Sequence, residues 1–125
     1  MAANQVWSMD FVFDRTAALL VAKLHKIDDR QGTGRQSDKD ALDALRLLRG
    51  TDTGDLAVRF RALLDDSKSA EVAEAALTLL RTQFGTRGGV GIVMATRSAG
   101  PLVDAGELAG SSLALADDVL KALKP

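Results

Sequence analysis

The chain lacks cysteine entirely and contains few aromatic residues, which make up only 4% of its 125 positions. Without cysteine it can form neither disulfide bonds nor thiolate metal sites. Leu, Ala and Val supply most of the hydrophobic 46% of the chain. Because Leu and Ala lose little side-chain freedom in a helix, this composition favours helices over strands.

Long apolar runs are also missing, since none approaches the roughly 18 to 20 residues that a membrane-spanning helix needs. The apolar N-terminal stretch contains Asp10 and Asp14 and has no basic segment before it, unlike a signal peptide. We therefore expect a cytoplasmic protein with no membrane partner. With 26% charged residues, the chain has the size and balance of one globular domain.

No charge of either sign dominates, because 16 basic and 17 acidic residues give a net charge of −1. Proteins that bind nucleic acid through many phosphates usually carry a clear positive excess. A local excess exists within residues 15–50, which hold eight Lys or Arg and five Asp. We therefore do not expect nucleic acid as a partner.

The segment Val6–Phe13 is the only one rich in aromatic and β-branched residues, a composition typical of a strand. A lone strand would leave its backbone groups unpaired and an apolar face in water. We therefore expect a homodimer in which residues 5–14 of two chains pair as antiparallel strands. The candidate dimer contacts are Val6, Trp7, Met9, Phe11 and Phe13.

The rest of the chain has the three- and four-residue apolar spacing of amphipathic helices. The expected helices are Thr16–Arg30, Ser37–Arg49, Asp55–Asp65, Ser69–Phe84 and Ala105–Leu123, with a short one at Ile92–Ser98. In the first, the apolar face consists of Ala17, Leu20, Val21, Leu24 and Ile27. We predict an all-α bundle of five or six helices, preceded by one short N-terminal β-strand.

A basic stripe lies on the first predicted helix, where Lys23, Lys26 and Arg30 share a face. These side chains could bind nucleotide phosphates. The simpler interpretation is a solvated face opposite the apolar one, as on most amphipathic helices.

An acidic group at the start of the second predicted helix, Asp38, Asp40 and Asp43, has the ligand type that Mg²⁺ prefers. Helix capping by Ser37 and Asp40, together with the helix dipole, explains the first two without a metal. The spacing of Asp43 fits ion pairs with Lys39 and Arg46. We therefore expect no metal site.

Two other features have ordinary structural interpretations. His25 is the only histidine, and nothing in the sequence marks a nucleophile to act with it, so we expect it on a helix surface. The glycine-rich run at 85–91 lacks the Gly-Lys-Ser/Thr ending of a phosphate-binding loop, which favours a hinge or tight turn.

Residues from about 18 to the C-terminus resemble the helical part of actinobacterial nucleotidyltransferase-like proteins related to the AbiEii type of abortive-infection toxin. The resemblance rests on Lys23, Arg30, the pair Lys39-Asp40, and Asp43. It implies a domain that supports a nucleotide-binding site. The catalytic Gly-Ser and paired Asp residues of such families lie upstream on a sheet and have no counterpart here, so no transfer chemistry is implied.

Residues 4–14 resemble the first catalytic-core strand of insertion-sequence-3-type transposases, which belong to the integrase family. In that pattern Asp10 would be the first of three metal-binding carboxylates, and nothing downstream supplies the other two. We hypothesise a chimera, in which a transposase-like segment at residues 1–17 precedes a nucleotidyltransferase-like helical domain at 18–125.

Taken together, these patterns predict a helical domain that is not an enzyme, needs no cofactor and acts by binding a protein or a nucleotide. The candidate ligand-binding residues are Lys23, Lys26, Arg30, Lys39, Asp40 and Asp43. One alternative is an accessory subunit of a nucleotidyltransferase toxin whose catalytic domain is on another chain. A second alternative is a DNA-binding remnant of a transposase.

Overall fold

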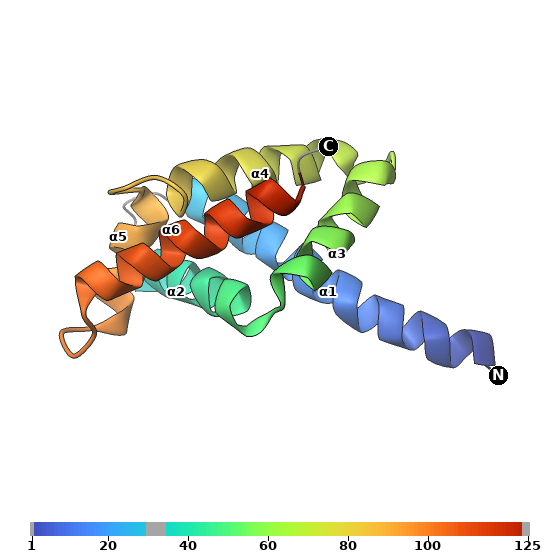
Figure 1. The fold of residues 1–125 in the computed structure, drawn as a ribbon, viewed down its shortest axis with the longest axis horizontal. Helices are drawn as coiled ribbons and strands as arrows, with labels where there is room; N and C mark the ends of the chain where they lie inside the picture. The colour runs from blue at the N-terminus through green and yellow to red at the C-terminus, as the bar shows by residue number, and fades with distance from the viewer. Residues whose placement is uncertain (1, 30–34, 124–125) are drawn as a thin grey trace.

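The computed structural model describes the backbone of residues 2–29 and 35–123, and the side chains of residues 15–29 and 38–123. Within these ranges the chain forms six helices and no strand (Figure 1). The helices are α1 (Ala2–Asp29), α2 (Arg35–Gly50), α3 (Thr53–Asp65), α4 (Ala70–Gln83), α5 (Val90–Ala99) and α6 (Ala105–Ala122). The predicted all-α class is confirmed.

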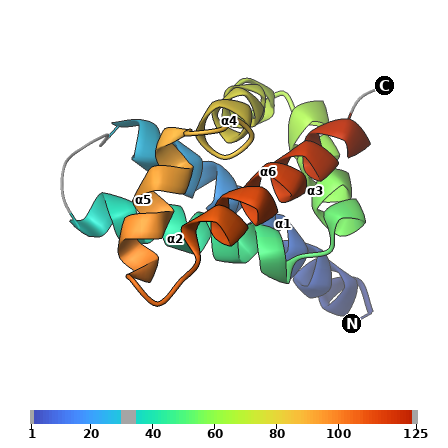
Figure 2. The same ribbon diagram turned by 60° about the vertical axis from the view of Figure 1, so that its left-hand side comes forward.

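Helix α1 is the longest and runs through the bundle, in contact with α2, α3 and α4. Its first half, residues 2–14, projects beyond the other five helices (Figures 1 and 2). We call this half the arm. Helix α5 packs on α2 and lies at the end of the molecule opposite the arm. Helix α6 crosses the bundle between α5 and the arm (Figure 1).

The N-terminal strand expected at Val6–Phe13 is wrong, because these residues belong to helix α1. A strand satisfies its N–H and C=O groups only through a neighbouring strand, and the described residues contain none. A helix makes those bonds within its own segment. The side chains of the candidate dimer contacts lie outside the described residues. Helix α1 also passes without a break through residues 17 and 18, where the sequence suggested a fusion point.

The boundaries of the other helices agree with the expectations within a few residues. Asp52 and Asp104 accept hydrogen bonds from the backbone N–H groups of Asp55 and Glu107, both at 3.1 Å, and so start α3 and α6. The cap expected at Ser37 is wrong. Helix α2 begins at Arg35, which places Ser37 inside the first turn.

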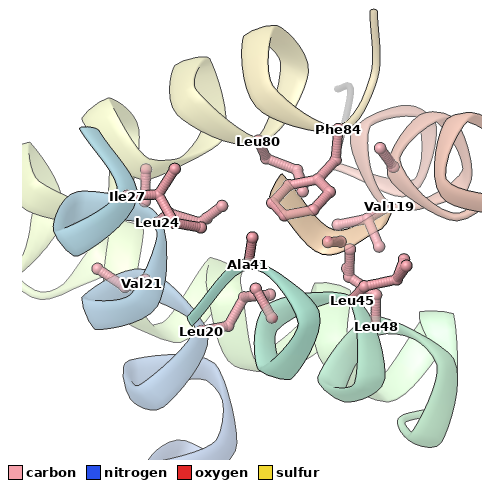
Figure 3. Packing of buried hydrophobic residues seen from close by; sticks show 14 of the residues in the cluster. Leu20, Val21, Leu24, Ile27, Ala41, Leu45, Leu48, Leu80, Phe84 and Val119 are labelled. Atoms are coloured by element: carbon pink, nitrogen blue, oxygen red, sulfur yellow. The ribbon is translucent and has the colours of Figure 1, made fainter. Parts of the chain in front are cut away.

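The core confirms the apolar face predicted for the first helix, because its five residues are all buried. In Figure 3, the side chains of Leu24 and Ile27 lie on one side of Ala41, and the ring of Phe84 lies on the other. The buried side of α2, including Leu45 and Leu48, completes this layer. Val72 of α4, by contrast, is 50% exposed.

Most of the glycine-rich run at 85–91 forms the turn between α4 and α5, as expected, and its last two residues begin α5. Gly88 has a φ of 75°, which L side chains rarely adopt. Gly91 lies against the ring of Phe84, and a Cβ there would be only 2.7 Å from the ring carbon Cζ. The turn therefore allows α5 to pack closely on the core.

Candidate functional site

The structure brings together three of the predicted ligand-binding residues, Lys23, Asp40 and Asp43. Helix α1 supplies the lysine and α2 supplies the two carboxylates. Lys23 Nζ donates to Asp40 Oδ1 at 2.8 Å and to Asp43 Oδ2 at 3.4 Å. We call these three residues the ion-pair cluster. It joins segments 17 to 20 residues apart in the chain.

The cluster is largely shielded from water. The Asp40 side chain is 1% exposed and that of Lys23 is 16% exposed. Hydrogen bonding to Asp40 raises the pKa of Lys23 above its ordinary 10.5, although burial acts in the opposite direction. The expected role of Asp40 in a capping box is wrong, because α2 begins at Arg35 and Asp40 Oδ2 has no hydrogen-bond partner among the described residues. The carboxylate joins two helices instead.

The other charged residues that the sequence singled out differ in their surroundings. Arg46 lies 3.7 Å from Asp43, as expected for residues one turn apart. Lys26 and Lys39 are exposed. Arg30 lies outside the described residues. The basic stripe predicted on α1 is therefore not a set of three equivalent cations, since Lys23 is held by carboxylates of α2.

The charges of this region cancel locally. Lys23 and Arg46 contribute two positive charges, and Asp40 and Asp43 contribute two negative ones. Carboxylates that already occupy Lys23 would compete with a phosphate for the same protons. Among the described residues, no group of three or more His, Cys, Asp or Glu side chains could hold a metal ion. The geometry thus favours a structural role for the cluster over phosphate binding.

His25 joins α1 to α4, which the sequence did not indicate. Its Nε2 lies 3.3 Å from the carbonyl oxygen of Val72, and the side chain is partly rather than fully exposed. Nearby, the buried amide of Gln83 donates to the carbonyl oxygen of Leu24 at 3.0 Å. Both bonds fix α4 against α1, and sequence spacing carries no signal for contacts between residues 47 and 59 positions apart.

A second cross-helix ion pair was also missed. Arg97 of α5 holds Asp38 of α2 with both Nε and Nη2, at 3.2 and 2.9 Å. Asp38 also lies in the first turn of α2, as expected for a carboxylate that interacts with the dipole of its own helix. The Arg97 side chain is 55% exposed, so this pair contributes little stability on its own.

Hollows on the surface differ in chemistry. One of about 400 Å³ is lined by Leu19, Lys23, Asp43, Arg46 and Leu47, beside the ion-pair cluster. Another of about 170 Å³ lies between α1 and the corner where α3 meets α4. It is lined by Ala18, Val21, Leu63, Ser69, Val72 and Ala73. We call this second hollow the apolar groove, because five of its six lining residues are hydrophobic.

Comparison of the chain with protein-family models, with curated proteins and with solved structures finds no match. No helix in the described part of the chain is long and apolar enough to cross a membrane. The surface features of the chain that bear on its function are the arm, the ion-pair cluster and the apolar groove.

Proposed function

We propose that this chain is a non-catalytic helical module that binds protein, and that its partner is a second copy of itself. The observation that carries the proposal is the arm, a helical half of α1 that projects beyond the bundle (Figures 1 and 2). Most of the stability of a protein helix comes from packing of an apolar face against another element. A projecting helix therefore gains stability when another surface covers it.

The amino-acid sequence of the arm supports a protein partner. It contains the dimer-contact candidates Val6, Trp7, Met9, Phe11 and Phe13, together with Val12. A segment this rich in aromatic residues has the composition of an interface core. Aromatic residues are also the usual sites where binding energy concentrates. Dimerisation through residues 5–14 is thus retained in the proposal, with helix packing in place of strand pairing.

The ion-pair cluster supports protein binding over nucleotide binding, because Lys23 already has two carboxylate partners. The resemblance to the helical half of nucleotidyltransferase-like proteins stays a prediction, and it implies a module that supports an active site without performing the chemistry. We also retain the hypothesis of a chimeric origin, in which a transposase-like segment at residues 1–17 precedes the helical domain at 18–125. We expect the purified chain to show no Mg²⁺-dependent nucleotide transfer.

Removal of residues 1–14 tests the proposal. Full-length protein should elute as a dimer in light scattering, and the shortened chain should be a monomer with a helical circular dichroism spectrum. The point variant Phe11→Asp, which keeps the arm in place, should also weaken the dimer because burying an unpaired charge is costly. A monomeric full-length chain at high micromolar concentration, or a dimeric shortened chain, would contradict the proposal.

A further inference from the structure

We infer that the arm of each chain packs into the apolar groove of a second copy, so that two chains exchange arms reciprocally. This inference rests on the self-association proposed above and adds the surface that receives the arm. Two observations carry it. The groove is open and hydrophobic. The corner between α3 and α4, whose residues line the groove, lies at the end of the bundle from which the arm leaves (Figure 1).

The groove exposes apolar surface where a packed core would be expected. Val72 is 50% exposed although it lies on the apolar stripe of α4. Ala18 of α1 is exposed and has only a methyl group with which to cover its neighbours. Leu63, at the end of α3, is partly buried. A hydrophobic segment placed here would remove Val72 and Ala18 from water, which stabilises the complex.

The size of the groove matches one aromatic ring. Its volume is about 170 Å³, and an apolar cavity of roughly 150 Å³ is large enough to bind benzene. Of the five aromatic residues in the chain, Phe60 and Phe84 are fully buried in the core. The other three, Trp7, Phe11 and Phe13, all belong to the arm. The chain therefore carries both the receptor and its complementary segment.

The Trp7 end of the arm cannot reach the groove of its own chain. Helix α1 is continuous from Ala2 to Asp29 and includes both the arm and Ala18. At 1.5 Å per residue, position 7 lies roughly 16 Å along the axis from position 18. A continuous helix holds the two apart, so the arm that enters the groove comes from another molecule.

Two-fold symmetry completes the arrangement. If the two α1 helices run antiparallel, each arm lies along the groove of the other chain, and both grooves are filled in a closed dimer. On helix α1, Trp7 and Phe11 lie four residues apart and so share one face, whereas Phe13 lies on another. Aromatic side chains bury about 150–250 Å² each, so the four rings on this face of two arms supply about 600–1,000 Å². Stable interfaces bury about 1,200–2,000 Å² in total. The aliphatic residues of the arm and groove bring the contact into this range.

Cysteine crosslinking tests the arrangement in an otherwise cysteine-free chain. The double variants Asn4→Cys/Val72→Cys and Ser8→Cys/Val72→Cys are oxidised and run on a non-reducing gel. A covalent dimer is expected from at least one pair, with little from any single variant. Ser8→Cys alone should not link, because the antiparallel arrangement keeps the two copies of residue 8 well beyond the 4.4–6.8 Å Cα separation of a disulfide.

Efficient linking of the Ser8→Cys single variant would overturn the inference, since it would show that the arms pair with each other. A dimeric protein in which neither double variant links would overturn it as well. Either result leaves the proposed self-association intact. If the full-length chain is monomeric, that result would instead contradict the proposed function, which is self-association.

A charge in the groove gives a second test with a matched control. Val72→Glu should weaken the dimer at least tenfold without changing the circular dichroism spectrum, because this side chain is half exposed and Glu favours helices. Val58→Glu, at a valine that is 58% exposed on α3 and does not line the groove, should leave the dimer unchanged. Equal dimer dissociation constants for the two variants would contradict docking in the groove.

Discussion

The amine of Lys23 lies 2.8 Å from Asp40 Oδ1, although the two residues belong to different helices and are 17 positions apart. This pair is the best-shielded ion pair that links α1 to α2. Its burial means that each partner depends on the other for stabilisation in a weakly polar environment. Lys23 and Asp40 therefore hold the first two helices in register.

Lys23→Met should lower the free energy of unfolding by about 3 kcal/mol, because it leaves Asp40 buried without its cation. Chemical denaturation followed by circular dichroism measures the change. The double variant Lys23→Met/Asp40→Leu should recover much of the loss, since it removes both charges. If the single and double variants lose equal stability, the packing of the lysine stem rather than its charge is responsible.

The same pair predicts a loss of stability at alkaline pH. The pKa of Lys23 is raised in the folded state by its hydrogen bond to Asp40, above the ordinary 10.5 of an unfolded chain. Lys23 thus binds its proton more tightly in the folded state than in the unfolded state. The stabilisation that the charged lysine provides is complete below pH 10.5, the ordinary pKa of lysine in the unfolded chain. This stabilisation disappears as the pH rises through the folded-state pKa.

The difference in unfolding free energy between the native chain and Lys23→Met measures this effect. It should be constant near neutral pH and should shrink above about pH 10.5. Comparison with the variant removes the contributions of other titrating groups, such as Lys121, which both proteins share. A difference that grows in alkaline solution has the wrong sign for this mechanism.

Gly91→Ala should destabilise the fold by about 1–3 kcal/mol, the range for overpacking a well-filled core. The new Cβ would lie 2.7 Å from Phe84 Cζ, so either the ring or α5 must move. Gly110→Ala on the exposed side of α6 is the matched control, because a Cβ there meets no atom within 4 Å. The control should stabilise the helix by about 0.5–1 kcal/mol. Thermal unfolding of both variants distinguishes close packing from helix propensity.

Duplex DNA should bind weakly and without sequence preference at physiological salt, because the net charge is −1 and Lys23 is held by two carboxylates. Fluorescence anisotropy with a labelled duplex at roughly 150 mM salt measures the affinity. Replacing the exposed residues Lys26 and Lys39 by Ala should change it little. Submicromolar, sequence-selective binding would favour the DNA-binding alternative.

Several properties of this protein follow from local sequence and could be predicted without the structure. The all-α class, the approximate bounds of the helices after residue 15 and the buried face of α1 all depend on side chains three or four residues apart. The ion pair of Asp43 with Arg46 is of the same kind, since it joins neighbouring turns of one helix. Such contacts are set by helix geometry alone.

Tertiary structure decided the rest. The partners of Asp40 and Asp38 lie 17 and 59 residues away, and spacing within one helix contains no information about them. The apolar groove lies where α1, at Ala18 and Val21, meets the corner between α3 and α4, three elements that are far apart in the sequence. The segment Val6–Phe13 has the composition of a strand, but the described chain offers no strand to pair with it. A helix satisfies the backbone of that segment locally, whereas a strand depends on hydrogen bonds to a neighbour that only the whole fold can supply.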